Sequence, residues 1–184
     1  MLLLIKNGTV INPGDKTQQK ADVLVEDGVI KKIAPKQSVK ADKVIDAKDC
    51  LVMPGFIDLH VHLRDPGQEE KETVETGAKA AAHGGYTTIV AMPNTKPVVD
   101  NPDVVNYVHH KAEDVAVVNV LQVGAITVGQ RGTELADIEG MVEAGIEVAM
   151  LDYSESLEQI RDELSALGKV YAFRCDLTDR KNRE

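Results

Sequence analysis

The chain has 184 residues, 43% of them hydrophobic, which is enough for the core of one ordinary domain or of a small domain joined to part of a larger one. Its net charge of -9, without a clustered basic patch, excludes nucleic acid and anionic membrane surfaces as expected partners. No stretch approaches the roughly 20 apolar residues of a membrane span. The apolar run at the N-terminus is too short for a signal peptide, so we expect a cytoplasmic globular protein.

Residues 1–53 have the pattern of short strands joined by tight turns. Strands are expected over 2–6, 8–11, 21–34, 43–46 and 51–53. The segment 21–34 folds back at Asp27-Gly28, which lies between alternating valines and isoleucines, and this is a strong signal for a two-residue hairpin turn. The sequence therefore predicts a small β-sandwich-like module over residues 1–53.

Strands and helices alternate after this module. Helices are expected over 71–83, 102–113, 134–143 and 154–167, and strands follow Phe56 and cover 86–92, 115–123, 147–151 and 169–175. Such alternation favours a parallel sheet with right-handed crossovers. A closed eight-stranded barrel typically needs ~250 residues. The chain is thus predicted to be α/β, with about half of a TIM-type (β/α) barrel over 54–184, in which 153–184 form a divergent tail.

Two histidines lie two positions apart at the end of the first strand of this region. Side chains at i and i+2 of a strand point to the same face, so His60 and His62 can bind a single metal ion. Leu59, Val61 and Leu63 would then pack on the opposite face. A pair of strand histidines that only bond to backbone groups is the structural alternative.

Three further polar residues follow predicted strands. Arg64 comes after the histidines, Asn94 after the second strand and Asp152 after the fourth. The carboxyl ends of strands in (β/α) architectures converge on one face of the barrel, so these side chains are expected to lie together at that open end of the barrel. There Arg64 could bind a substrate carboxylate with two hydrogen bonds, although pairing with Asp65 or Glu69 at the surface is the alternative.

Several motifs resemble one family. They are Pro-Gly-Phe-Ile-Asp-Leu-His-Val-His-Leu-Arg-Asp-Pro-Gly at 54–67, Ala-Met-Pro-Asn-Thr-Lys-Pro at 91–97, Gly-Ala-Ile-Thr at 124–127 and Glu-Leu-Ala-Asp-Ile-Glu-Gly-Met at 134–141. Together with the leading β module they resemble dihydroorotase of the amidohydrolase superfamily. The resemblance runs from residue 1 to about residue 145.

The resemblance implies zinc-dependent interconversion of dihydroorotate and N-carbamoyl-L-aspartate in pyrimidine biosynthesis. His60 and His62 match the paired metal ligands, and Arg64 and Asn94 match the groups that hold the substrate carboxylate. Asp152 matches a metal-bridging aspartate, which makes it a candidate metal ligand and catalytic residue, although its neighbours depart from the family pattern. The family's further metal-binding histidines and late general-base aspartate have no counterpart in this sequence, so an incomplete form of the enzyme is expected.

The tail and the incompleteness leave two alternatives open. The first is a non-catalytic, truncated or chimeric domain that at most binds metal or self-associates through exposed barrel edges. The second comes from residues 155–179, which resemble a βαβ segment of short-chain dehydrogenases and would indicate a nucleotide-binding fragment.

Overall fold

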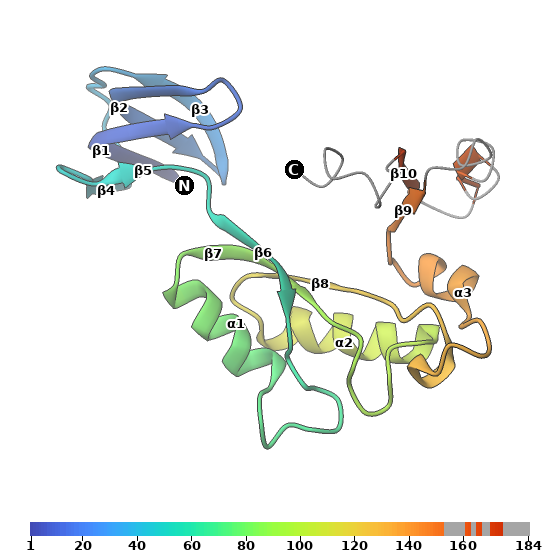
Figure 1. The fold of residues 1–184 in the computed structure, drawn as a ribbon. Helices are drawn as coiled ribbons and strands as arrows, with labels where there is room; N and C mark the ends of the chain where they lie inside the picture. Colours follow the sequence, from blue (N-terminus) through green and yellow to red (C-terminus); the bar gives the residue numbers. More distant parts are fainter. Residues whose placement is uncertain (153–160, 163–164, 167–169, 175–184) are drawn as a thin grey trace. The chain divides into compact units, whose positions relative to one another are not determined.

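The computed structural model describes residues 1–152, 161–162, 165–166 and 170–174. The chain divides into two compact units, Met1–Gly55 and Phe56–Glu184, whose helices and strands are labelled in Figure 1. Among the residues described, no helix is long and apolar enough to cross a membrane.

The first unit contains a single five-stranded sheet. Its strands are β1 (Leu2–Asn12), β2 (Thr17–Glu26), β3 (Val29–Ala34), β4 (Lys43–Asp46) and β5 (Leu51–Val52). They follow the order β3-β2-β1-β4, and β5 also pairs with β1. β1 is antiparallel to β2 and parallel to β4 and β5. The two strands expected over 2–6 and 8–11 are thus one strand, whose register with β2 shifts between Ile5 and Gly8.

The predicted hairpin turn at residues 27–28 is confirmed. Asp27 has a φ of 48° and Gly28 a φ of 80°, so both central residues take the positive values that a primed turn requires. Val10, Ala21 and Val23 form the buried core beside this hairpin. Alternation in β2 therefore places Ala21 and Val23 inward, whereas the apolar residues of β3, Val29, Ile30 and Ile33, are exposed, so the predicted alternation does not bury an apolar face on this second strand.

The second unit begins with a parallel sheet and two crossover helices. The strands are β6 (Phe56–Val61), β7 (Tyr86–Ala91) and β8 (Asn119–Gln122), and the helices are α1 (Val74–His83) and α2 (Pro102–Val115). The strand order is β6-β7-β8, and both helices lie on the same side of the sheet (Figure 1). Leu63, Val74, Ile89 and Ala91 form the core between the sheet and α1. The predicted alternation is confirmed, but β8 starts later than expected because α2 continues to Val115.

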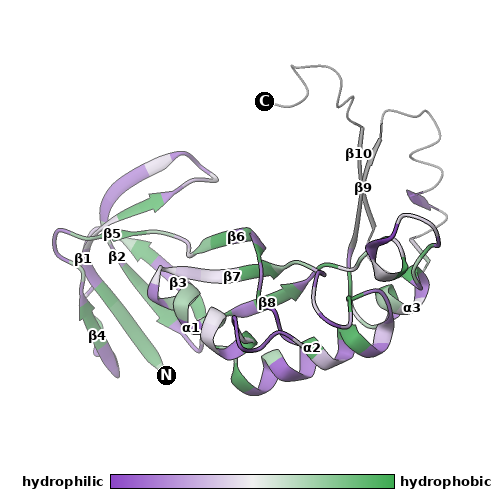
Figure 2. Ribbon diagram, turned by 60° about the horizontal axis from the view of Figure 1, so that its bottom comes forward, coloured by the Kyte–Doolittle hydropathy of each residue, from purple (hydrophilic) through white to green (hydrophobic). Residues whose placement is uncertain are grey.

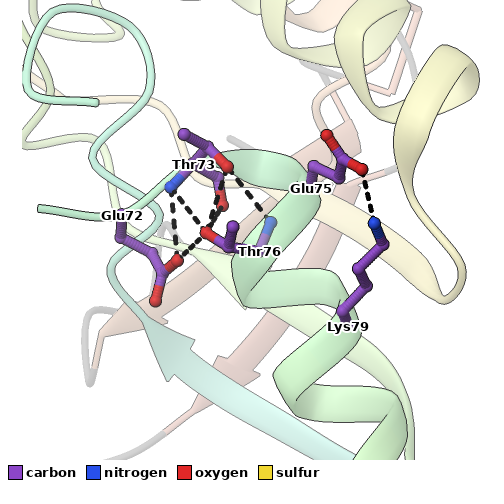
Figure 3. A network of polar contacts seen from close by, with 5 residues as sticks. All are labelled: Glu72, Thr73, Glu75, Thr76 and Lys79. Atoms are coloured by element: carbon purple, nitrogen blue, oxygen red, sulfur yellow. Dashed lines mark hydrogen bonds and ion pairs between the residues drawn. The ribbon is translucent and has the colours of Figure 1, made fainter. Parts of the chain in front are cut away.

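Helix α1 begins three residues after its predicted start because Thr73 caps it. The Thr73 hydroxyl accepts from the N–H of Thr76, and the Thr76 hydroxyl accepts from the N–H of Thr73 (Figure 3). This reciprocal arrangement is a capping box, which satisfies two N–H groups that have no partner within the helix. Glu75 and Lys79 form an ion pair on the next turn. The helix ends before Gly85, whose φ of 83° reverses the chain as the sequence predicts.

The last elements are η1 (Val128–Gln130), α3 (Ile138–Glu143), β9 (Val148–Asp152) and β10 (Val170–Arg174). β9 and β10 pair in parallel as a separate two-stranded sheet. The prediction of a helix from residue 134 was wrong at its start, because Ala136 still bonds as extended chain to Ile126. Asp137 then caps the helix by accepting from the N–H of Gly140 at 2.9 Å. The helix expected over 154–167 lies mostly outside the described residues.

The apolar residues of β6 do not all face the core. Leu63 is buried and Val61 half-buried, as predicted, but Leu59 is 71% exposed, so its predicted packing was wrong. The physical reason is that β6, an edge strand of the three-stranded sheet, shifts its register with β7 between Asp58 and Val61, so the strict alternation behind the prediction is interrupted at Leu59. Ile57 on β6 and Leu121 on β8, the other edge strand, are also exposed, and much of β6 has hydrophobic colouring in Figure 2.

Candidate functional site

The two histidines lie together at the carboxyl end of β6. His60 is in the strand, and His62 follows its last residue, Val61. The centroids of the two imidazole rings are 5.1 Å apart, and the ring planes meet edge to face at 71°. Both side chains are exposed, and the backbone N–H of His60 donates to Asp58 Oδ1 at 3.1 Å. The strand end therefore presents two neighbouring imidazoles that are open to a ligand.

Asn94 lies directly against the second histidine. It is in the loop that follows β7, and its Oδ1 is 2.8 Å from Nδ1 of His62. Parallel pairing of β6 with β7 brings the two strand ends side by side, and the N–H of Met92 extends this pairing by donating to the carbonyl of Val61 at 2.8 Å. The structure thus brings together three of the five predicted site residues.

Arg64 lies in the loop after β6 with a left-handed backbone, at a φ of 62°. Its guanidinium makes no hydrogen bond or ion pair with any residue that the structure describes, so the alternative of a surface pair with Asp65 or Glu69 is not found. Asp65 is buried and faces other partners. Its Oδ1 accepts from the Tyr107 hydroxyl at 2.9 Å, and its Oδ2 accepts from the N–H of Val74 at 3.4 Å.

Asp152 is the last residue of β9, at a strand end as predicted, and its backbone pairs with Arg174 of β10. The position of its side chain lies outside what the structure describes. Across the described ranges, no cluster of three or more histidine, cysteine, aspartate or glutamate side chains is suited to a metal ion. The described site therefore consists of two imidazoles and the amide of Asn94.

Sequence reasoning missed the contact between Asp65 and Tyr107. The pKa of Tyr107 is raised by burial and by the hydrogen bond to the Asp65 carboxylate. The two residues are 42 positions apart, and Tyr107 is in α2, while Asp65 belongs to the loop after β6. No local sequence pattern indicates this pair. It could have been found only from the packing of α2 beside the loop after β6.

A second missed feature is the contact between the two loops that carry the site. The N–H of Lys96 donates to the carbonyl of Pro66 at 2.9 Å. Gln68 Nε2 lies 3.4 Å from the carbonyl oxygen of Asn94. Gly67 has a φ of 87°, and a Cβ there would lie 1.7 Å from the carbonyl oxygen of Lys96. The loops after β6 and β7 are therefore packed together as closely as backbone allows.

Known proteins are similar to this chain in sequence. The family described as dihydro-orotase-like matches residues 49–158. The dihydroorotase of Aquifex aeolicus is 51% identical over 143 residues, which are 78% of this chain and 34% of that protein. The dihydroorotase of Clostridium acetobutylicum is 47% identical over 170 residues, 92% of this chain and 40% of that protein. The chain thus spans between a third and two fifths of the length of these relatives.

Solved structures share the fold. The L-hydantoinase (dihydropyrimidinase) of Arthrobacter aurescens superposes with a TM-score of 0.71 at 27% identity, over 92% of this chain and 40% of that one. A D-hydantoinase (dihydropyrimidinase) of Thermus sp. gives a TM-score of 0.64 at 28% identity, over 92% and 39% of the two chains. These similarities confirm the predicted fold class, an N-terminal β module followed by part of a (β/α) barrel.

The comparisons also bear on the tail. A match that covers 92% of the chain extends into residues 153–184, beyond the limit near residue 145 that the motifs indicated. Neither the family match nor these relatives support the resemblance of residues 155–179 to short-chain dehydrogenases. The family match, which covers more than half of the chain, shows that this chain belongs to the dihydro-orotase-like family.

Proposed function

We propose that the chain carries the first part of a dihydroorotase-type cyclic amidohydrolase, which interconverts dihydroorotate and N-carbamoyl-L-aspartate in pyrimidine biosynthesis with the help of zinc. The observation that carries the proposal is the group of His60, His62 and Asn94 at adjoining strand ends, in a chain whose relatives are named dihydroorotase. A cytoplasmic location and a small-molecule substrate are part of the proposal.

The spacing of the two histidines supports a shared metal ion. A Zn–N bond of about 2.0–2.1 Å, extended to the ring centre, puts each centroid about 3.2 Å from the ion, and a tetrahedral angle then separates the centroids by about 5.2 Å. The observed separation of 5.1 Å is close to this value. His60 and His62 thus fit two positions of a zinc site, and we propose Asp152 as a third ligand and as the catalytic carboxylate. Bound zinc would activate water and polarise the amide carbonyl.

Arg64 and Asn94 are the proposed groups for the substrate carboxylate. A guanidinium presents N–H groups that match a carboxylate with two parallel hydrogen bonds. The Arg64 side chain is half-buried, and within the described ranges it has no competing anion. Asn94 adds an amide N–H at the neighbouring strand end. Holding the carboxylate here would orient the cyclic amide toward the histidines, which is the positioning that hydrolysis needs.

Exposed apolar side chains support a second candidate, a non-catalytic domain that at most binds metal and self-associates. Ile57 and Leu59 on β6 and Leu121 on β8 lie on the two edge strands of the sheet. Unpaired edges with exposed apolar residues are the usual sites of association between chains. The described part of the chain also supplies fewer than the three protein ligands of a catalytic zinc site.

Zinc content and turnover separate the two candidates. The purified chain is assayed for bound zinc and for conversion of dihydroorotate in both directions, and His60→Ala is the matched control. The enzyme proposal expects turnover that falls by at least about 100-fold in His60→Ala, because the metal site loses a ligand. Zinc that is retained without turnover would support the non-catalytic candidate, and a chain with neither property would refute the enzyme proposal.

Self-association is tested with one substitution in each unit. Light scattering after size-exclusion chromatography should give a mass above that of one chain, and Leu59→Asp should lower it because a charge on β6 opposes edge pairing. Val29→Asp, an exposed position in the hairpin of the first unit, should leave the mass unchanged. A monomeric wild-type chain would contradict the proposal.

A further inference from the structure

We propose that Asn94 sets the tautomer of His62 as well as binding substrate. A neutral imidazole carries a hydrogen on one ring nitrogen and a lone pair on the other. The atom of Asn94 that faces Nδ1 of His62 at 2.8 Å is the amide oxygen, which can only accept. Nδ1 must therefore carry the hydrogen, and Nε2 keeps the lone pair. Since a metal ligand needs that lone pair, Asn94 prepares His62 to bind through Nε2.

The orientation of the amide links this role to the substrate. If the Asn94 amide turned over, its N–H would donate to Nδ1 of His62, and the hydrogen would move to Nε2, where it blocks metal binding. A substrate carboxylate accepts hydrogen bonds only, so it selects the orientation in which Nδ2 of Asn94 faces the substrate and Oδ1 faces His62. One amide orientation thus serves both partners. This link to metal and carboxylate rests on the proposed function, whereas the tautomer assignment rests on the hydrogen bond alone.

The backbone around Asn94 is held in place from the neighbouring loop. Its carbonyl oxygen lies 3.4 Å from Nε2 of Gln68, and the N–H of Lys96 donates to the carbonyl of Pro66 at 2.9 Å. The close approach of Gly67 to Lys96 leaves no room between the loops. The adjacent Thr95 is buried. The backbone that carries the Asn94 side chain is therefore held by packing before any ligand arrives, which is what a positioning residue requires.

His60 provides a control within the same site. Among the described residues, its ring has no hydrogen-bond partner, and it meets the His62 ring edge to face. The tautomer of His60 is therefore free of Asn94, although both histidines are exposed and lie at the same strand end. A change at Asn94 that acts through the hydrogen bond should alter His62 and leave His60 as it was.

Nitrogen chemical shifts of the imidazole rings give the decisive test. The metal-free chain, with ¹⁵N-labelled histidine, is compared with Asn94→Asp, which keeps an acceptor, and with Asn94→Leu, which removes it. We expect wild type and Asn94→Asp to show His62 protonated at Nδ1, and Asn94→Leu to show a substantial Nε2–H population, while His60 is the same in all three. Asn94→Ser, too short to reach the ring, replaces Asn94→Leu if the latter does not fold. Protonation at Nε2 in the wild type, or an unchanged His62 in Asn94→Leu, would overturn the proposal.

Zinc affinity, measured by competition with a chromogenic chelator, tests the consequence. Loss of a group that orients a metal ligand typically weakens metal binding by about 10- to 100-fold, so this loss is expected for Asn94→Leu, while Asn94→Asp retains the affinity. Equal affinities in the wild type and Asn94→Leu would contradict the link to metal. If the wild-type chain binds no zinc, the proposed function fails, and the chemical shifts still decide the tautomer.

Discussion

Each of the two units buries an aspartate, and the partners of the two carboxylates differ. In the first unit, Asp22 accepts from the backbone N–H groups of Asn7 and Gln37, both at 2.9 Å. In the second unit, Asp65 accepts from the Tyr107 hydroxyl at 2.9 Å and from the N–H of Val74 at 3.4 Å. One carboxylate is held by backbone alone, while the other depends on a side chain from a distant helix.

The difference shows that a buried, hydrogen-bonded aspartate has a different role in each unit. Asp22 joins the irregular middle of β1 to the segment before β4, and it stabilises a sheet that carries none of the proposed site residues. Asp65 joins the loop after β6 to the start of α1 and to α2, and this loop carries Arg64. A buried carboxylate with all its bonds satisfied makes its surroundings rigid. In the second unit that rigidity lies beside the site.

The largest expected effect on the free energy of unfolding comes from replacing a glycine of positive φ. One such glycine in each unit allows a comparison. A Cβ at Gly67 would meet the carbonyl oxygen of Lys96, whereas a Cβ at Gly28 would meet nothing within 4 Å. Gly67→Ala should therefore cost about 3 kcal/mol, from backbone strain and displacement of the loops, and Gly28→Ala about 1 kcal/mol from strain alone. Urea unfolding of each variant measures the two costs. Equal losses would show that the loop contact carries no energy of its own.

A smaller effect is expected at Asp22, and it depends on pH. The hydrogen bonds from the N–H groups of Asn7 and Gln37 lower the pKa of Asp22, with burial acting in the opposite direction. A lowered pKa in the folded state gives stability that is present above the ordinary aspartate pKa of about 4 and is lost as the pH falls through the folded value.

Asp22→Asn should therefore destabilise the first unit by about 2 kcal/mol at pH 7, and the difference from wild type should shrink below about pH 4. Hydrogen exchange of the β1 and β2 amides reports on this unit separately from the second. A difference that persists unchanged in acid would contradict the assigned role of the carboxylate.

The smallest expected effect is at Tyr107. Tyr107→Phe removes one hydrogen bond to a buried carboxylate and should cost about 1.5 kcal/mol, because Asp65 keeps the bond from Val74. The loss should appear in the exchange of α1 and α2 amides and leave the first unit unchanged. Since the pKa of Tyr107 is raised, the contribution of this bond should fade only at alkaline pH, as the hydroxyl ionises. A change in the β1 amides would contradict the separation of the units.

Local patterns predicted the strands, the crossover helices and the hairpin turn well, because hydrophobic period and turn residues act within a few positions. The errors occurred where a specific contact determines the start of a helix or the exposure of a side chain. Thr73 and Asp137 cap their helices later than periodicity indicates, and Leu59 is exposed where a register shift interrupts the alternation of β6. Neither cap position follows from apolar spacing alone.

The sequence predicts which residues of the site lie at the strand ends, but not the contacts that their side chains make. The alternation of β6 and the parallel pairing of β7 bring His60, His62 and Asn94 together, and that follows from the sequence pattern. The bond between Asn94 and His62 and the burial of Asp65 against Tyr107 depend on side-chain packing between distant segments. No local pattern contains that information.

The left-handed backbone at Arg64 has a consequence for how such a site can change in evolution. At a φ of 62° the chain leaves the regular alternation of β6, so the direction of the Arg64 side chain is set by the loop and not by the strand. The histidines, in contrast, follow the strand end. A change in loop length or in the anchoring of Asp65 would therefore redirect the proposed carboxylate-binding group and leave the proposed metal-binding pair intact. Under the proposed function, substrate choice and metal chemistry can thus diverge separately on one strand end.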